Sequence, residues 1–221
     1  MSYVLFATLG LLPSFAWLLF FLREDIHPEP KKLIAKVFFY GAFVTVVATG
    51  FQFLFLYGLG LVAIGQYAFV SFLIFGTIEE VLKFAVAYKA VSKSSYFDEP
   101  VDAMIYMIAA GLGFAVVENI FVMFSIEALG VALGVIVLRF VGATLLHALS
   151  SALVGYYWAL SLIKARKKEL IIGLASASLL HALFNYLIMK TGNAMFYPVI
   201  FLIIVAFFVF WDFEQMKTRS E

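Results

Sequence analysis

The stretch Phe75-Gly76-Thr77-Ile78-Glu79-Glu80-Val81-Leu82-Lys83 sets three ionisable side chains in a run of residues that is otherwise almost wholly apolar. Each charge near the centre of a bilayer costs about 2.5 to 3.5 kcal/mol on insertion scales. Two adjacent carboxylates and a lysine in such a run therefore indicate a membrane helix that carries a functional site. The structural alternative is an ion pair from Glu79 or Glu80 to Lys83, since residues three and four apart share one face of a helix.

The composition around this stretch indicates an integral membrane protein. Hydrophobic residues make up 65% of the 221 residues, whereas an ordinary soluble domain has about 45 to 50%. A spanning helix needs about 20 apolar residues, so the chain has room for about seven spans. We expect one transmembrane domain over residues 1–221, located in the cell membrane with the lipid bilayer as its surroundings. The net charge of +1 argues against a nucleic-acid partner, and the lack of cysteine excludes thiol catalysis.

Apolar runs separated by polar residues or by Gly and Pro predict an all-α bundle of about seven transmembrane helices. Lys and Arg gather in alternate connections, after the first, third, fifth and seventh of these runs. The positive-inside rule then places the N-terminus outside and the C-terminus inside. The predicted helices cover residues 3–22, 33–57, 64–90, 102–124, 136–161, 170–190 and 195–211.

Two pairs of glycines suggest close contacts between helices. Gly111 and Gly113 lie in an apolar run with no strand before it, which favours helix packing over nucleotide binding. Gly130 and Gly134 have the four-residue spacing that lets two helices approach each other.

Four of the predicted helices carry rare polar residues at a similar depth. Counted at about 1.5 Å per residue from the basic ends, these residues lie about 14 to 24 Å deep. Isolated polar groups need not share a depth, whereas groups around one water-filled cavity must. The sequence therefore predicts a common polar cavity. The residues are Glu79 and Glu80 in the third helix, Glu118 in the fourth, His147 in the fifth, and His181 and Asn185 in the sixth.

Each of these residues also has a simpler interpretation. A lone membrane histidine such as His147 is often a hydrogen-bond partner between helices. Glu118 can be a ligand, a proton carrier or the group that orients a histidine. Arg139 is expected to extend its side chain to the membrane interface, and Gln52 is expected to serve helix packing or a local hydrogen bond.

Together, two glutamates, two histidines and an asparagine suit the activation of water. A glutamate in a low-dielectric setting can accept a proton from water, which then attacks a carbonyl carbon. A histidine can assist this transfer, and His181 and Asn185, four residues apart, can donate hydrogen bonds to the oxyanion that develops. Membrane Glu and His chains also serve as proton relays, so a proton-coupled transporter is an alternative. A scaffold without catalytic activity is another.

Five motifs in this order resemble the PrsW family of intramembrane proteases, which is distantly similar to the CAAX prenyl endopeptidases. The likeness covers about residues 26–190. It implies an intramembrane endopeptidase that hydrolyses a peptide bond of a single-pass membrane protein, with an anti-sigma factor as the family's substrate. The motifs are Glu79-Glu80-x-x-Lys83, Phe97-Asp98-Glu99-Pro100-x-Asp102, Gly111-Leu112-Gly113-Phe114-Ala115-x-x-Glu118-Asn119, His147, and His181-x-x-x-Asn185.

The resemblance also implies roles for these residues. Glu79 is the general base, Glu80 orients the base or the substrate, His147 assists, and His181 with Asn185 forms the oxyanion site. This mechanism needs no cofactor and no metal, and it is the one we expect.

The family has also been described as metalloproteases. On that alternative, Glu80, Glu118, His147 and His181 would form a mixed oxygen and nitrogen site for zinc.

Overall fold

The computed structural model describes residues 3–61, 68–192 and 196–219, and within them the chain forms α-helices and no strand. The predicted all-α class is therefore confirmed. The starts of the predicted helices 64–90 and 195–211, at residues 64–67 and 195, lie outside the described residues. The helices are α1 (Tyr3–Phe21), α2 (Lys31–Leu61), α3 (Phe69–Val91), α4 (Pro100–Phe124), α5 (Leu129–Val141), α6 (Ala143–Ile163), α7 (Lys167–Thr191) and α8 (Phe196–Lys217).

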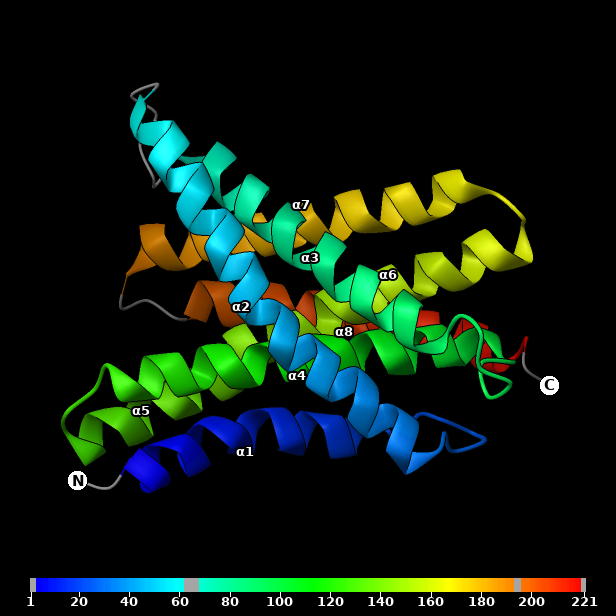
Figure 1. The fold of residues 1–221 in the computed structure, drawn as a ribbon, viewed down its shortest axis with the longest axis horizontal. Helices are drawn as coiled ribbons and strands as arrows, with labels where there is room; N and C mark the ends of the chain where they lie inside the picture. Colours follow the sequence, from blue (N-terminus) through cyan, green and yellow to red (C-terminus); the bar gives the residue numbers. More distant parts are fainter. Residues whose placement is uncertain (1–2, 62–67, 193–195, 220–221) are drawn as a thin grey trace.

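Six segments of the described chain are long and apolar enough to cross a membrane: α1, α2, α4, α5 with α6, α7 and α8. The helix α3 carries more charge, but it runs between the same two ends of the bundle as its neighbours (Figure 1). The protein is thus a multi-pass membrane protein, with six candidate spans among the described residues and α3 beside them. The α1–α2, α3–α4 and α6–α7 connections and the end of α8 lie at one end of the bundle, and the start of α1 lies at the other.

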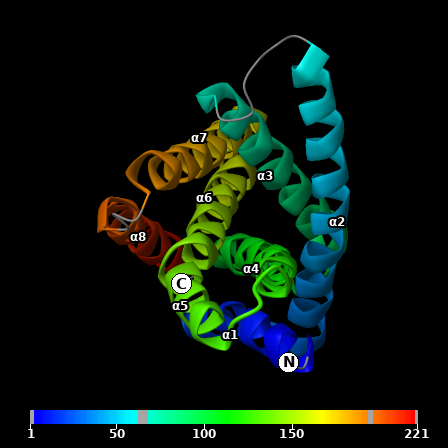
Figure 2. The same ribbon diagram turned by 90° about the vertical axis from the view of Figure 1, so that its left-hand side faces the viewer.

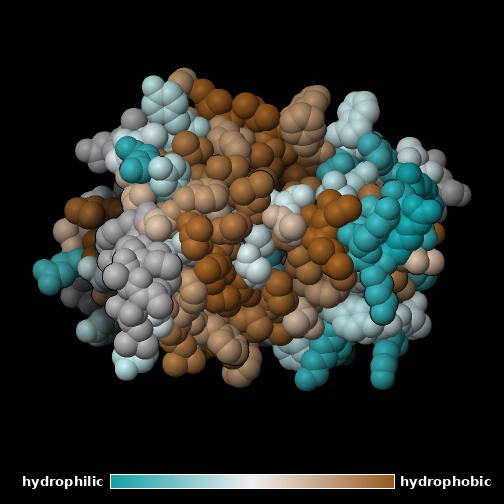
Figure 3. All heavy atoms as spheres, turned by 90° about the horizontal axis from the view of Figure 1, so that it is seen from above, coloured by the Kyte–Doolittle hydropathy of each residue, from teal (hydrophilic) through white to brown (hydrophobic). Residues whose placement is uncertain are grey.

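The surface agrees with a membrane setting. Figure 3 shows hydrophobic residues across the middle of one face, and hydrophilic residues gathered at the end that holds the basic connections. Large apolar side chains point outward along the helices, among them Phe43 and Phe53 of α2 and Phe207 of α8. A soluble monomer rarely exposes so much contiguous apolar surface, so these side chains face lipid. Which end of the bundle is cytoplasmic stays a prediction.

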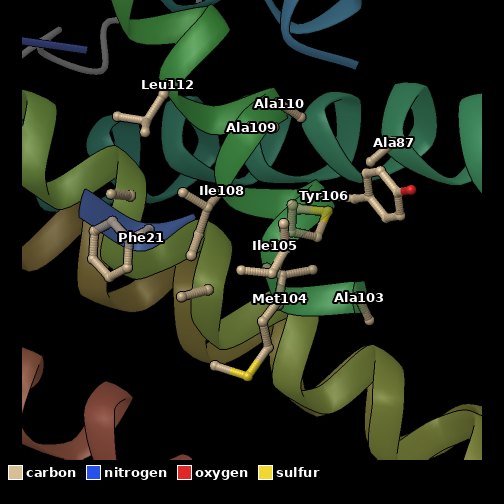
Figure 4. Close-up of a cluster of buried hydrophobic side chains, with 14 of the residues drawn as sticks. Phe21, Ala87, Ala103, Met104, Ile105, Tyr106, Ile108, Ala109, Ala110 and Leu112 are labelled. Atoms are coloured by element: carbon tan, nitrogen blue, oxygen red, sulfur yellow. The ribbon is translucent and has the colours of Figure 1, made fainter. Parts of the chain in front are cut away.

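The helix α4 forms the centre of the bundle (Figure 2). Every residue from Val101 to Val116 is buried, as expected for a helix that is apolar on all sides. It packs against α6, α2 and α1, and Figure 4 shows Phe21 of α1 and Ala87 of α3 beside its residues Ala103 to Leu112. A capping box starts this helix, because the Asp102 carboxylate accepts hydrogen bonds from the backbone N–H groups of residues 98 and 99.

The two glycine pairs behave differently. A Cβ atom on Gly113 would lie 1.9 Å from the Phe38 carbonyl oxygen of α2, and one on Gly111 would lie 2.2 Å from Ser151 Oγ of α6. Close packing at this pair is confirmed. For Gly130 and Gly134 the prediction is wrong, since a Cβ on either would meet nothing within 4 Å.

The reason is the orientation of α5, whose buried residues are Ala132 and Ile136. Each of these lies two positions from a glycine, which is about 200° around the helix axis. The glycines therefore face away from the bundle.

The predicted helix 136–161 is broken in the structure. Gly142 separates α5 from α6 with a non-helical backbone (φ −112°, ψ −101°). The break starts α6 one turn before His147, and it leaves α5 as a separate short helix whose last turn carries Arg139.

Candidate active site

Glu79 and Glu80 lie near the middle of α3, and both are buried. Glu80 is surrounded by hydrogen-bond partners: its Oε1 accepts from Lys83 Nζ at 2.8 Å and from Ser150 Oγ at 2.9 Å, and lies 3.1 Å from His181 Nδ1. Glu79 accepts one hydrogen bond, at 2.8 Å, from Gln52 Nε2 of α2. The second oxygen of each glutamate, Oε2, is buried and has no hydrogen-bond partner among the described residues.

Lys83 joins the glutamates to a histidine. Its ammonium is fully buried, lies over the ring of Phe114, and is 2.8 Å from His147 Nδ1 as well as from Glu80. It is also 3.9 Å from Glu79 Oε2. The ion pair that the sequence offered as a structural alternative is therefore present, and it forms part of a larger polar network.

His147 of α6 is held at both ring nitrogens. An ammonium can only donate, so Nδ1 accepts from Lys83 and the neutral ring carries its proton on Nε2. That nitrogen lies 2.9 Å from Glu118 Oε2 and donates to it. Glu118, on α4, in turn accepts from Arg139 Nη2 at 3.2 Å. These contacts fix both the orientation of the imidazole and its tautomer.

His181 of α7 lies between the two glutamates. Its Nδ1 is 3.1 Å from Glu80 Oε1, and its Nε2 is 3.5 Å from Glu79 Oε2. The ring meets that of His147 edge to face, with 5.2 Å between the centroids. Gly76 allows α3 to come this close to α7, since a Cβ there would lie 3.1 Å from His181 Cβ.

A cavity of about 360 Å³ joins these groups. Of the six residues predicted from the sequence, five line it, and Glu80 lies behind them in the Lys83 network. Asn185 contributes from α7, one turn after His181. The lining comprises Thr49, Glu79, Glu118, Phe121, Val122, Arg139, Ala143, Leu146, His147, His181 and Asn185.

Two residues of the site were missed by the sequence. Gln52 was assigned to packing or a local hydrogen bond, but it donates to Glu79 of another helix. Arg139 was expected at the membrane interface, but it lines the cavity and binds Glu118, so that prediction is wrong. The available signal was partial: both are lone polar residues in apolar runs, and a charged side chain such as that of Arg139 is costly to place within a membrane.

The residues can also hold a metal ion. Glu79, His147 and His181 each offer a ligand atom, and the three atoms lie within 4.8 Å of one another. The unpartnered Glu79 Oε2 fits such a role, and Glu80 would orient His181 through Nδ1, as carboxylates do for metal-bound histidines. To bind the metal, one ring nitrogen of His147 would have to give up its contact with Lys83 or with Glu118. The set expected from the sequence included Glu80, whose contacts to Lys83 and Ser150 keep it out of this group.

Comparison with known proteins gives one consistent family. A family model described as PrsW family intramembrane metalloprotease matches residues 29–211. A protein named Protease PrsW from Bacillus subtilis (strain 168) is 30% identical over 216 residues, which cover 96% of this chain and 93% of the relative. A protein of the same name from Clostridioides difficile (strain 630) is 28% identical, over 87% of this chain and 80% of the relative. No solved structure matches.

Proposed function

The chain belongs to the PrsW family of intramembrane proteases and is a peptidase, and on this premise we propose that Glu79 is the base that activates water to cut a membrane-anchored substrate. The observation that carries the proposal is the contrast between the two glutamates. Glu80 is engaged by Lys83 and Ser150. Glu79 lines the cavity, and its Oε2 has no hydrogen-bond partner among the described residues; Glu80 also has such an oxygen, but it does not line the cavity.

The reaction is hydrolysis of a peptide bond. A water molecule beside Glu79 Oε2 gives a proton to the carboxylate, while its oxygen bonds to the carbonyl carbon of the substrate. The Asn185 amide, which lines the same cavity, donates a hydrogen bond to the oxyanion that forms. When the carbon–nitrogen bond breaks, the proton held by Glu79 passes to the leaving amine.

The two histidines take different parts in this scheme. His181, 3.5 Å from Glu79, lies where it can assist the movement of the proton between water and leaving group. His147 is held by Lys83 and Glu118 and keeps its Nε2 proton. These positions favour His181 as the histidine beside the base. They favour Asn185 as the main hydrogen-bond donor to the oxyanion, whereas the resemblance implied His181 and Asn185 together.

The proposed substrate is a single-pass membrane protein, with a membrane-anchored anti-sigma factor as the first candidate. Glu79 lies near the middle of a bundle whose outer surface faces lipid, so a substrate must present its peptide bond from within the membrane. This setting and the family favour hydrolysis over proton-coupled transport or a scaffold role.

A metal-dependent form of the same reaction is the second candidate. It is favoured by the ligand atoms of Glu79, His147 and His181, which lie within 4.8 Å of one another, and by the description of the family as intramembrane metalloproteases. These three residues would hold the ion, and a bound zinc ion would supply a Lewis acid for water activation. In that form Lys83 or Glu118 must release His147.

The proposal is tested by cleavage in proteoliposomes. A membrane-anchored anti-sigma factor with a tag at each end is incubated with the purified protein, and the new termini are located by mass spectrometry. Loss of the general base in Glu79→Gln should lower kcat by about 10²- to 10⁴-fold. Glu214→Gln, which alters an exposed carboxylate at the end of α8, should cleave like the wild type. Wild-type cleavage rates in Glu79→Gln would refute the assignment.

A further inference from the structure

Arg139 connects α5 to the active site through charged contacts. Its guanidinium donates to Glu118 Oε2 at 3.2 Å through Nη2 and to the side-chain oxygen of Asn119 through Nε. The side chain is 18% exposed, which is too little for a group that extends to the membrane interface. The planar guanidinium therefore binds two neighbouring residues of α4 at once, as its fixed arrangement of donors allows.

Both hydrogen-bond partners of Arg139 also form hydrogen bonds with residues of α6. Asn119 uses its amide nitrogen to donate to Thr144 Oγ1 at 3.1 Å, and Glu118 accepts from His147 Nε2 at 2.9 Å. Thr144 and His147 lie in the first two turns of α6. Arg139 thus lies at the start of a chain of contacts that ends at the imidazole next to the catalytic cluster.

We propose that Arg139 is a positioning residue of the active site, which holds Glu118 against His147; this inference rests on the proposed function. Glu118 is partly exposed to the cavity, with 29% of its side chain accessible. Without a cation beside it, that carboxylate gains freedom to turn toward water. His147 would then lose the acceptor that fixes its tautomer. Because arginine stays protonated under all ordinary conditions, the contact acts as a permanent restraint.

Arg139 is not needed to hold α5 in place, which makes the proposal testable. The ring of Phe140 stacks on Trp17 of α1 with 5.1 Å between centroids, and Trp17 Nε1 donates to the Phe140 carbonyl oxygen at 2.8 Å. These contacts fix the last turn of α5 independently of the guanidinium. A variant at Arg139 should therefore keep its fold.

The first test compares Arg139→Gln with Arg166→Gln in the cleavage assay. Arg166 is an exposed arginine at the start of α7, in the connection from α6. Loss of a positioning contact should lower kcat about 10- to 100-fold in Arg139→Gln, with KM and melting temperature close to those of the wild type. Arg139→Lys should recover part of the rate, because an ammonium keeps the charge but cannot reproduce the two-pronged contact. Arg166→Gln should match the wild type.

The second test asks whether Arg139 acts through Glu118. In the Glu118→Gln background, adding Arg139→Gln should change kcat little, because the restrained carboxylate is already gone. Multiplied losses in the double variant would contradict the proposal and indicate direct contact with substrate. Unchanged kcat in Arg139→Gln would also contradict it. An inactive wild type would instead refute the proposed function, so the two failures are distinct.

Discussion

Two carboxylates that are adjacent in the chain have different surroundings in this site. Successive residues of a helix point about 100° apart, so Glu80 faces Ser150 of α6 and His181 of α7, while Glu79 faces Gln52 of α2 and the cavity. The ammonium of Lys83 balances Glu80. One glutamate is thereby fixed by its neighbours, and the other lines the cavity.

Gln52 should matter for catalysis, because it is the one described hydrogen-bond donor to Glu79 Oε1. Gln52→Leu removes that bond and lets the carboxylate rotate. We expect kcat to fall about 10- to 100-fold, as for other partners of catalytic groups, without loss of folded protein. Phe53→Leu, at the next position and facing outward, is the matched control. Equal kcat values for the two variants in the cleavage assay would show that Gln52 does not position Glu79.

Sequence reasoning singled out Glu79 and Glu80 by the cost of burying charge, and it placed Glu118, His147, His181 and Asn185 at a similar depth. It could not divide the roles of the two glutamates, because that depends on which neighbours each one meets. Arg139 was missed because a long side chain near a helix end can extend either to the membrane interface or into the interior of the bundle. The sequence alone does not choose between these two positions.

At the scale of helices, α4 is the element against which the others pack. Glycines let its neighbours approach closely: Gly113 faces the backbone of α2, and Gly155 of α6 faces the Ala103 carbonyl oxygen. The close approach of α2 brings Gln52 within reach of the site, and that of α6 does the same for His147.

Gly113→Ala should destabilise the bundle. The new Cβ would lie 1.9 Å from a backbone carbonyl oxygen that has no freedom to move aside, and overpacking of this kind costs about 1 to 3 kcal/mol. The free energy of unfolding in detergent measures the effect. Gly130→Ala meets nothing within 4 Å and should be neutral or slightly stabilising. Equal stability of the two variants would contradict the close packing of α2 and α4.

The helices themselves were predictable from the sequence, because apolar runs of this length have few alternatives in a membrane. The break at Gly142 was not, since the residues on both sides of it are equally apolar. It depends on tertiary contacts: Trp17 holds Phe140, and Glu118 holds both Arg139 and His147. Similarly, the spacing of Gly130 and Gly134 suggested packing, but the face that α5 turns inward is fixed by its neighbours.

For the whole molecule, the basic connections at one end of the bundle predict the orientation in the membrane. The chain has no cysteine, so single introduced cysteines report sidedness without background. Ser95→Cys, in the α3–α4 connection, should resist a membrane-impermeant thiol reagent in intact cells and react after lysis. Glu127→Cys, in the α4–α5 connection, should react in intact cells. The reverse pattern would invert the topology.

In the proposed mechanism Glu79 activates water without a bound metal, within a network that already occupies both nitrogens of His147. Metal content, measured alongside cleavage activity in purified, chelator-treated protein, tests this mechanism. We expect full cleavage in protein that holds far less than one equivalent of metal, and no gain when zinc is added. Activity that disappears with the chelator and returns in proportion to bound metal would contradict it, and would assign Glu79, His147 and His181 as ligands.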